Sequence, residues 1–344
     1  MTRAEVYGFE RYFSAVLTLI QFFIMSHSRD SQQKGEAALT PRRRVVVRLM
    51  AGLGNQLFQY ALGRRMAMDR GASLHLDAYW YDKSHNIAPH LPLGLHLFRT
   101  AGEMTFDDRW MEVWKPTGLA GRIRRRFEER YLPILWRRVI LEDVGRQKSG
   151  EAFDSRILRA PRRDVYLRGY WPSPRYFGGV EHLVRSELQL KNENVGGPFG
   201  EYLGKVRNSE SVSVHIRRGD IKNFPDFGMM GAGYYQRAIQ IIQEKVREPR
   251  FFVFSDDIAE ARKLLAPVAA CNYVEMGPDS NPAYDVALMS ACKHFINANS
   301  TFSWWGAWLS ANPQKIVIVP DQWLPGLGRQ VNNIYSPEWV QLPV

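Results

Sequence analysis

Cysteine is scarce in this chain of 344 residues, which contains only Cys271 and Cys292. Two cysteines cannot staple a domain of this size, so a disulfide scaffold is excluded and a reducing cytoplasm is indicated. The sequence has no CxxC pair and no Cys/His cluster of the kind that holds zinc. Long apolar runs are also lacking, because Tyr12–Met25 has about 14 residues where a span through hydrocarbon needs roughly 20.

The N-terminal extension, residues 1–44, allows three interpretations. Tyr12–Met25 can be an interfacial anchor, a poor signal-like segment or a part outside the working enzyme, and Met25 is itself a candidate start. Residues 26–41 are polar, as in a flexible lead-in. We expect the folded protein to begin at Val45.

Acidic residues are outnumbered, with 35 Asp and Glu against 46 Lys and Arg, a net charge of +11 at pH 7. A basic balance favours anionic partners, and part of the excess lies in three patches: Arg42–Arg44, Arg122–Arg126 and Arg137–Arg138. A solvated face is the first interpretation, and attraction to anionic lipid headgroups is the second. No nucleic-acid partner is expected, because no zinc-ligand spacing, aromatic RNP pattern or basic zipper accompanies the charge.

The first half of the chain begins as an α/β unit. Val45–Leu49 is a β-branched run typical of a buried strand, and Asn55–Arg70 has helical apolar spacing. Ser73–Asp77 is the next expected strand, and residues 86–161 are irregular. The half continues with a strand, a helix and a Gly-rich linker, expected over Val165–Gly169, Pro174–Leu190 and Asn192–Gly200.

The second half alternates strands and helices regularly. Strands are expected over Ser211–Ile216, Phe251–Phe254, Asn272–Glu275, His294–Asn297 and finally Ile316–Val319; helices over Tyr234–Glu248, Ile258–Leu265, Ala283–Ala291 and Ser303–Ser310. Such alternation predicts a mainly parallel sheet with helices on both faces. The fold class is therefore α/β, with two Rossmann-like domains, residues 45–200 and 201–344, facing across a cleft.

Ligands of open α/β sheets bind beyond the carboxyl ends of the strands, and four polar clusters follow expected strands. The first is His215–Asp220, HIRRGD. Two adjacent arginines cannot point the same way from an extended segment, so one of Arg217 and Arg218 can clamp a diphosphate while the other pairs with a carboxylate. A surface salt-bridge network is the alternative.

The second cluster is Phe254–Asp257, FSDD. Asp257 can simply cap the next helix. Asp256 is the better candidate to contact a nucleotide or to support the arginines. A carboxylate pair also suggests a metal, but no third ligand follows at a persuasive spacing, so no metal is expected.

The third cluster, Asn297–Gly306, leaves a strand and enters a helix. Small polar residues beside free N–H groups form an anion site, here from Asn299, Ser300, Thr301 and Ser303. Ordinary capping followed by core tryptophans is the alternative, and capping is compatible with phosphate binding.

The fourth cluster is the Gly52–Gln56 turn, GLGNQ. No GK[ST] follows, so it is not a Walker loop, and it lacks the third glycine of a dinucleotide fingerprint. Gly52 and Gly54 let backbone approach a ligand, and Asn55 or Gln56 can hydrogen-bond a sugar or phosphate.

Together these segments resemble the ordered motifs of the α-1,2-fucosyltransferase family over Val45–Trp323. The motifs are AGLGNQLFQYALGRRMA, GYWPSPRYF, VSVHIRRGD, FFVFSDD and LMSACKHFINANSTFSWWGAWLS. The sequence departs from the family pattern in Ala51, where a third glycine is common, and in Pro172 and Pro174. We expect these two prolines to affect the acceptor that the protein uses and not the donor.

The resemblance implies a GT-B fold, GDP-β-L-fucose as donor, no cofactor or metal, and inversion to an α-1,2 linkage on galactose. It implies that Arg217 holds the β-phosphate, that His215 lies beside the nucleotide, and that Asn55 lies between donor and acceptor. Ser300–Ser303 would bind phosphate. Asp285 resembles the carboxylate that reads guanine, or is simply a helix N-terminal residue.

The predicted reaction is a single displacement by a galactoside α-1,2-fucosyltransferase, with Asp220 as the guessed base. The predicted acceptor is a galactose-terminated glycan of the surface-polysaccharide type, with a lipid-linked unit as one option. The predicted location is cytoplasmic, and peripheral membrane contact is left open. Alternatives are a fucosyltransferase of another linkage (α-1,6 or protein O-fucose), a transferase for a different nucleotide sugar, and a non-catalytic sugar-binding protein.

Overall fold

The structure is a computed structural model. It describes residues 43–82, 91–110, 118–131, 139–142, 153–159, 164–192, 196–219, 228–266, 268–278, 280–324 and 334–344. All but the last two residues of the predicted N-terminal extension therefore lie outside the described residues. Residues 43–344 form one compact unit by their contacts.

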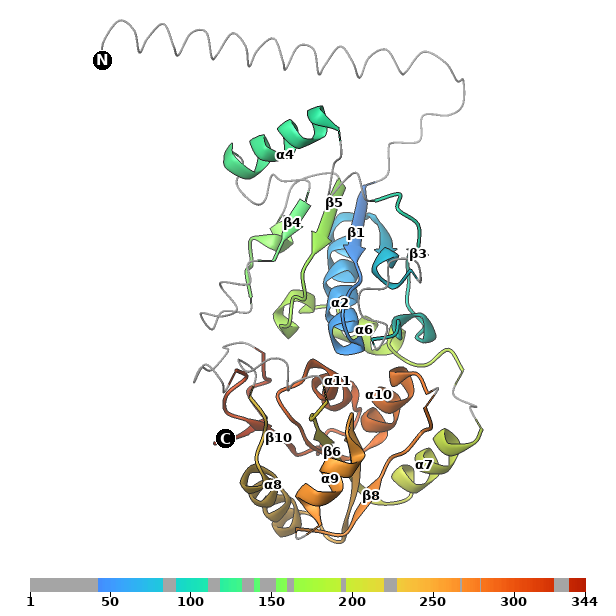
Figure 1. Cartoon of the computed structure of the whole chain (residues 1–344), viewed down its shortest axis with the longest axis vertical. Helices are drawn as coiled ribbons and strands as arrows, with labels where there is room; N and C mark the ends of the chain where they lie inside the picture. Colours follow the sequence, from blue (N-terminus) through green and yellow to red (C-terminus); the bar gives the residue numbers. More distant parts are fainter. Residues whose placement is uncertain are drawn as a thin grey trace, which may run out of the picture. The chain divides into compact units, whose positions relative to one another are not determined.

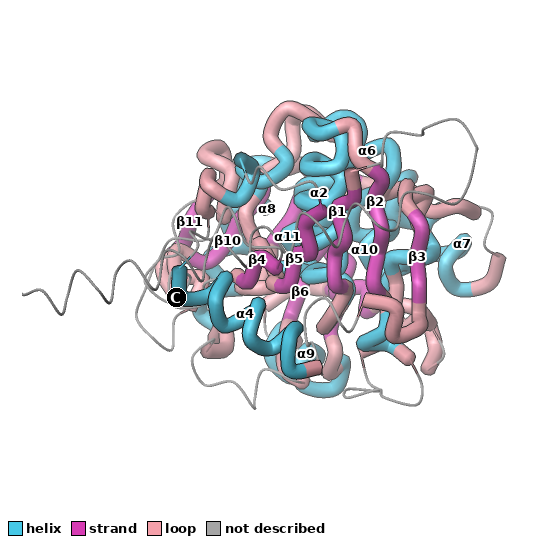
Figure 2. Tube along the Cα trace, turned by 90° about the horizontal axis from the view of Figure 1, so that it is seen from above, coloured by secondary structure: helices cyan, strands magenta, loops and turns pink. Residues whose placement is uncertain are grey.

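The first sheet has five parallel strands in the order β3-β2-β1-β5-β4 (Figure 2). They are β1 (Arg44–Arg48), β2 (Ser73–Asp77), β3 (Glu103–Thr105), β4 (Val139–Leu141) and β5 (Asp164–Arg168). The central strand β1 is buried along Val45, Val46 and Val47, as its β-branched run predicts. The two edge strands β3 and β4 lie in the segment that the sequence left irregular.

Helix α2 (Leu53–Arg70) follows β1 and ends at Gly71, whose φ of 56° gives the left-handed cap that favours glycine. The predicted helix over 174–190 is wrong in its middle. The chain forms a 3₁₀ turn, η5 (Pro174–Phe177), and then α6 (Glu181–Glu187), with Gly179 between them at φ 86°. The described residues of this half also contain α4 (Leu119–Tyr131) and the 3₁₀ turns η1 (Tyr79–Tyr81), η2 (Leu95–Leu97) and η4 (Ile157–Arg159).

The second sheet has six parallel strands in the order β11-β10-β9-β6-β7-β8. Three of them, β10, β6 and β8, are labelled in Figure 1. They are β6 (Glu210–Ile216), β7 (Pro249–Ser255), β8 (Cys271–Tyr273), β9 (His294–Ile296), β10 (Val317–Pro320) and β11 (Val340–Leu342). The helices are α7 (Pro198–Arg207), α8 (Ala232–Lys245), α9 (Ile258–Leu265), α10 (Pro282–Ala291) and α11 (Thr301–Leu309).

Two boundary predictions for this half need correction. The expected linker over 192–200 already contains the start of α7, because Pro198 is well placed in the first turn of a helix. The expected last strand, 316–319, is followed by β11, which pairs with β10 in parallel. The predicted parallel α/β architecture is confirmed in both halves.

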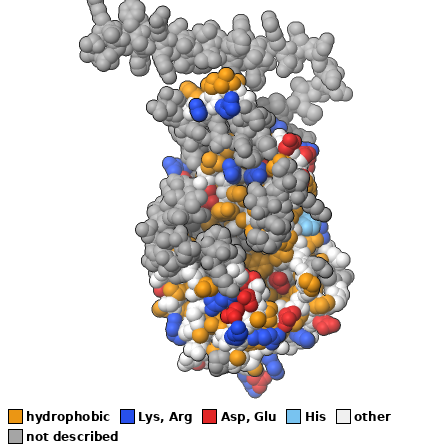
Figure 3. Space-filling view, in the orientation of Figure 1, with side chains coloured by type: hydrophobic (Ala, Val, Ile, Leu, Met, Phe, Trp, Pro, Cys, Tyr) orange, Lys and Arg blue, Asp and Glu red, His pale blue; other side chains and the backbone are white. Residues whose placement is uncertain are grey.

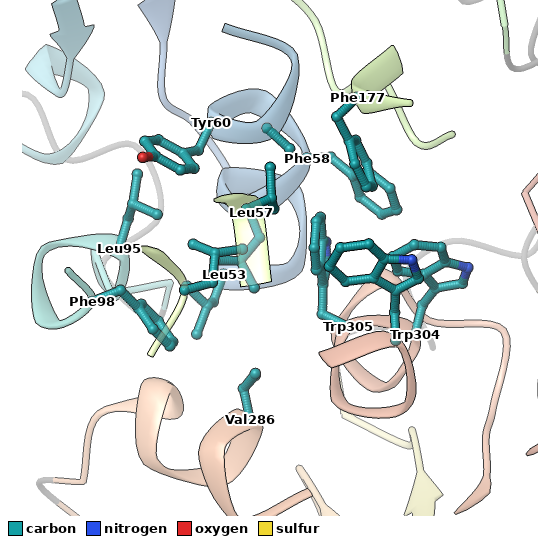
Figure 4. Packing of buried hydrophobic residues seen from close by; sticks show 14 of the residues in the cluster. Leu53, Leu57, Phe58, Tyr60, Leu95, Phe98, Phe177, Val286, Trp304 and Trp305 are labelled. Carbon is teal, nitrogen blue, oxygen red and sulfur yellow. The ribbon is translucent and has the colours of Figure 1, made fainter. Parts of the chain in front are cut away.

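One aromatic cluster joins the two sheets' helices (Figure 4). The ring of Phe58 in α2 lies 4.8 Å from Trp304 and 4.9 Å from Trp305, both in α11. Phe177 stacks on Trp305 at 5.5 Å. All four side chains are buried, so the hydrophobic core runs continuously from the first sheet to the second.

Candidate functional site

The carboxyl ends of β6, β7 and β9 lie along one edge of the second sheet. In the parallel register His215 is opposite Phe254, and Val214 is opposite Ile296. The polar clusters that follow these strands are therefore neighbours, as the sequence predicts for an open α/β sheet.

The turn after β6 is held by a carboxylate. The Arg218 backbone N–H donates to Asp256 Oδ1 at 2.7 Å, and the Arg218 guanidinium donates to the Met230 carbonyl at 2.6 Å. A Cβ on Gly219 would lie 2.9 Å from Asp256 Oδ2, so the carboxylate has its place because residue 219 is glycine. Of the two roles expected for Asp256, the structure shows support of the arginine turn.

The two arginines thus differ. The Arg218 guanidinium donates to a backbone carbonyl and so has a structural contact, and the ligand contact expected of it stays a prediction. Arg217 directly follows buried Ile216 and is half-buried at the sheet edge. Asp257 is the side-chain cap of α9, accepting from the Glu260 backbone N–H at 3.1 Å. Asp220 lies outside the described residues.

The start of α11 combines capping with buried hydroxyls. Ser300 is the N-cap, and its Oγ accepts from the Phe302 backbone N–H at 3.3 Å. The Ser303 hydroxyl donates to the Ser300 carbonyl at 3.4 Å. Ser300 and Ser303 are both buried, whereas Thr301 is half-buried and donates its hydroxyl to Asn55 Oδ1 at 3.3 Å.

Two buried asparagines make hydrogen bonds that support the segment leading into α11. Asn299 donates its side-chain amide to the Trp323 carbonyl at 3.2 Å, which gives it a structural contact where ligand binding was expected. Asn297, which sequence reasoning did not select, donates to the Ser303 carbonyl at 3.1 Å. Its own carbonyl accepts from the Tyr234 hydroxyl at 2.6 Å. The only sequence signal for Asn297 was a polar residue at a strand end.

Strand β6 has a similar support from α8. The Tyr235 hydroxyl donates to the His215 carbonyl at 3.0 Å, and both tyrosines of the Tyr234-Tyr235 pair are buried. From the sequence these residues are two apolar positions of an amphipathic helix. The Tyr235 hydroxyl thus fixes the backbone two residues before Arg217, whereas the Tyr234 hydroxyl fixes the Asn297 carbonyl just after β9.

The start of α2 meets the start of α11. A Cβ on Gly54 would lie 2.5 Å from the Phe302 backbone nitrogen, and the Trp305 indole N–H donates to the Gly54 carbonyl at 3.0 Å. Gly54 therefore serves the helix–helix contact rather than the approach of a ligand that we expected. Gly52 is the N-cap of α2 and provides no side-chain cap.

Gln56 has a different role from the one expected. Its side-chain amide nitrogen donates to the Ala51 and Pro92 carbonyls at 3.0 and 3.1 Å. Its Oε1 accepts from the backbone N–H groups of Gly94 and Leu95 at 3.0 and 3.1 Å. All four hydrogen bonds of the Gln56 side chain join it to backbone groups. Gln56 therefore fixes the segment after residue 91, and its amide group is occupied by these contacts.

The result is a concentration of positive partial charge. A helix N-terminus carries about half a positive charge, and here two of them, α2 and α11, are in contact through Gly54 and Phe302. The His215 ring lies 5.8 Å from the Phe302 ring and links this contact to the end of β6, where Arg217 follows. An anion with two negative groups is the ligand that this arrangement favours.

Asp285 lies in the first turn of α10 and is half-buried. Burial raises the pKa of its carboxyl group to about 7. No described residue donates a hydrogen bond to the Asp285 carboxylate, so none of them offsets the cost of removing this group from water. The same described ranges contain no group of three metal-ligating side chains and no helix long and apolar enough to cross a bilayer.

Comparison with known proteins gives a family and a fold. Residues 141–343 match the family described as glycosyl transferase family 11. The chain is 30% identical over 306 residues to alpha-1,2-colitosyltransferase of Escherichia coli, across 87% of this chain and 98% of that protein. It is 24% identical over 331 residues to galactoside alpha-(1,2)-fucosyltransferase 2 of Rattus norvegicus, across 92% and 80%. A variant of FUT1 from Arabidopsis thaliana, solved with GDP, has a TM-score of 0.51 at 11% identity, across 88% of this chain and 75% of that one.

Proposed function

Because this chain belongs to glycosyl transferase family 11, we propose that it is an inverting α-1,2-fucosyltransferase that uses GDP-β-L-fucose without a metal. The family confirms that the protein is a glycosyltransferase and confirms the resemblance to the α-1,2-fucosyltransferases. The fold is of the GT-B type, as the resemblance implied. The donor, the acceptor and the stereochemistry are the proposal.

The observation that carries the proposal is the contact between the N-termini of α2 and α11, which the His215 ring links to the strand end that Arg217 follows. Two positive helix ends repel one another unless an anion lies near both. The negative charge of a diphosphate neutralises both helix ends, and an arginine guanidinium binds phosphate oxygens bidentately. A lectin needs no such arrangement, which makes the non-catalytic alternative the weaker one.

The mechanism we propose is a single displacement through an oxocarbenium-like transition state. Negative charge collects on the β-phosphate as GDP departs, and Arg217 with the first-turn N–H groups of α11 neutralises it. These donors are preorganised by Ser300, Asp256 and the two tyrosines of α8, so little reorganisation is needed during reaction. Asp220 remains a prediction for the general base.

Asn55 and Asp285 complete the proposed site. Asn55 bridges the two helix starts through Thr301 and is our candidate for the position between donor and acceptor. Asp285 supplies two acceptor oxygens, matching the N1–H and N2–H groups of guanine. Its position in the first turn of α10 also suits an acidic residue electrostatically, so the two interpretations are separated by experiment.

The acceptor we propose is a galactose-terminated glycan of a surface polysaccharide. A second candidate, α-1,2-colitosyl transfer, is favoured by the full-length similarity to the colitosyltransferase of Escherichia coli. Colitose is fucose without the 3-hydroxyl, so the same diphosphate and guanine contacts serve both donors. Competition between GDP-fucose and GDP-colitose in the same assay distinguishes the two candidates.

The first experiment measures GDP release from GDP-fucose with a panel of β-galactosides, with and without EDTA, followed by NMR of the product. EDTA-insensitive formation of Fuc-α-1,2-Gal is the expected result. An α-1,6 or protein-linked product would overturn the linkage, and loss of activity in EDTA would overturn metal independence. Failure to bind GDP would overturn the whole assignment.

The anion clamp is tested with Arg217→Ala. Removing one preorganised donor to a developing charge lowers kcat by about 10²–10³-fold, so we expect a loss of that size with little change in stability. Arg207→Ala, at an exposed arginine in the last turn of α7, is the control and should keep wild-type turnover. Turnover of Arg217→Ala within twofold of the wild type would refute the clamp.

A further inference from the structure

The first turn of α10 is tied to the first half of the chain by one side chain. Asn281 is the N-cap of α10, and its Oδ1 accepts from the Ala283 backbone N–H at 3.0 Å. Its side-chain amide nitrogen donates to the Leu93 carbonyl at 3.1 Å. Asp caps a helix as well as Asn does, but a carboxylate has no hydrogen to donate. The amide of Asn281 is therefore used at both ends, once in each half of the chain.

The carbonyl that accepts from Asn281 lies in a segment that α2 fixes. Gln56 of α2 is fully buried, and three of its hydrogen bonds go to backbone groups of residues 92–95. Gly94 lies between the two elements, because a Cβ there would be 3.0 Å from Leu53 Cδ1 and 3.0 Å from Asn281 Oδ1. The starts of α2 and α10 therefore hold the same short segment from two sides.

The position of Asp285 depends on the placement of α10. Asp285 lies one helical turn after Asn281, and no described residue donates a hydrogen bond to its carboxylate. Further along the helix, a Cβ on Gly306 of α11 would lie 2.6 Å from Met289 Cβ, so the two helices are in close contact there. Helix α10 is thus fixed at two points, to α11 near Met289 and to residues 92–95 through Asn281.

Surface charge does not account for the orientation of a nucleotide base. On the face of the second half shown in Figure 3, described acidic and basic side chains are interspersed, without an extended area of one sign. A field of one sign concentrates a charged ligand but does not orient a neutral ring. The orientation of guanine therefore depends on short contacts such as the one proposed for Asp285.

We propose that Asn281 is a positioning residue for the donor nucleotide, holding Asp285 where its carboxylate meets the guanine base. The inference rests on the proposed use of GDP-fucose. The N1–H and N2–H groups of guanine need two acceptor oxygens in fixed positions, and the hydrogen bond to the Leu93 carbonyl fixes them by fixing the start of α10. The same bond links the base contact to α2, next to Asn55, so the base site and the transfer site keep a constant separation.

Ordinary helix capping is the competing interpretation. A cap needs only the acceptor Oδ1, which Ser or Asp would also supply. Capping gives no reason for the donation to Leu93 in the other half of the chain. The two interpretations differ in what loss of the amide does, because capping alone predicts lower stability with unchanged nucleotide selectivity.

The test compares the wild type with Asn281→Ser, which keeps a cap but has no amide group to reach Leu93. Calorimetric titration measures the affinity for GDP and for inosine diphosphate, which lacks the 2-amino group of guanine. We expect Asn281→Ser to weaken GDP binding by about three- to tenfold, the size of one net hydrogen bond, and to lower the preference for GDP over inosine diphosphate. KM for GDP-fucose should rise by the same factor, with kcat within about twofold of the wild type. Asn281→Asp, which caps but cannot donate, should show the same loss.

The matched control is Asn312→Ser. Asn312 has the same two contacts elsewhere, because its Oδ1 accepts from the Gln314 backbone N–H at 3.0 Å and its amide donates to the Lys293 carbonyl at 2.9 Å. Lys293 directly precedes β9, at the opposite end of the sheet from the proposed site. We expect Asn312→Ser to lower the melting temperature about as much as Asn281→Ser does. It should leave both nucleotide affinities unchanged.

A double-mutant cycle with Asp285→Asn separates this inference from the proposed function. In the Asp285→Asn background, Asn281→Ser should weaken GDP binding no further, because the contact that it positions is already gone. Wild-type selectivity in Asn281→Ser, or an equal loss in both backgrounds, would overturn the positioning role while leaving the guanine contact in place. Wild-type GDP binding by Asp285→Asn itself would overturn the guanine contact, and the positioning role with it.

Discussion

Replacing Asp285 by asparagine is expected to make the protein more stable and its donor binding weaker. Burial raises the pKa of this carboxyl group from 3.8 to about 7. The folded protein therefore holds the proton more tightly than the unfolded chain, and the free energy of unfolding falls as the pH rises from about 4 to 7. Above pH 7 the ionised group opposes folding by up to ~4 kcal/mol, since one pH unit corresponds to about 1.4 kcal/mol.

Asparagine keeps the size of the side chain and removes the charge. At pH 8 we expect Asp285→Asn to raise the free energy of unfolding by about 2–4 kcal/mol, and at pH 4 to change it little. GDP should bind about 10- to 100-fold more weakly, because a hydrogen bond to a charged group contributes about 1.5–3 kcal/mol. Wild-type affinity for GDP should also fall as the pH drops below 7, whereas that of Asp285→Asn should not change.

The assay pairs urea unfolding at pH 4, 6 and 8 with calorimetric titration of GDP. The control is Asp69→Asn, an exposed carboxylate paired with Arg65 on α2, which should alter stability by less than about 1 kcal/mol and leave GDP binding unchanged. Wild-type GDP affinity in Asp285→Asn at pH 8 would refute the guanine contact. Reduced stability at pH 8 would refute the argument from burial.

Three other substitutions test the start of α2, two of them its contact with α11. Gly54→Ala should lower the unfolding free energy by about 1–3 kcal/mol and raise KM for the donor, because its Cβ would meet the Phe302 backbone. The control Gly204→Ala, with open space around it, should be neutral or stabilising. Equal effects of the two substitutions in urea titration would contradict the close contact. Ala51→Gly should raise the melting temperature by a few degrees, because Ala51 has a φ of 65°, a conformation that costs a residue with a side chain about 1 kcal/mol. A lower melting temperature in calorimetry would contradict this backbone strain. Trp305→Phe should destabilise by about 1–3 kcal/mol, because the buried Gly54 carbonyl loses its donor, and an unchanged urea midpoint would show that water replaces it.

The strongly patterned elements were predictable from the sequence. Ser73–Asp77 was predicted with the bounds of β2, because alternating apolar residues match the period of a half-buried strand. Strands β3, β4 and β11, each of three residues, were missed because only their pairing with distant strands defines them. Strands β8 and β9 are equally short, but the regular alternation of strands and helices in the second half predicted them. The predicted helix after Pro174 failed because two glycines interrupt an otherwise suitable apolar pattern.

The proximity of the polar clusters was predictable, but the hydrogen bonds within them were not. Polar clusters that follow neighbouring strands lie along one edge of the sheet, because parallel strands end together. Gln56 and Arg218 have the chemistry of ligand residues, yet their hydrogen bonds go to backbone groups of Pro92, Gly94 and Met230. No local pattern shows which distant carbonyl a side chain will meet, so these assignments required the fold.

The aromatic cluster of Phe58, Phe177, Trp304 and Trp305 limits how the enzyme can move. A hinge that swung the two sheets apart would expose all four rings to water. Each ring loses roughly 1.5–3 kcal/mol on exposure, so the swing would need about 10 kcal/mol, comparable to the whole folding free energy of a typical domain. An opening of that size is therefore costly, and we expect turnover to proceed without separating α2 from α11.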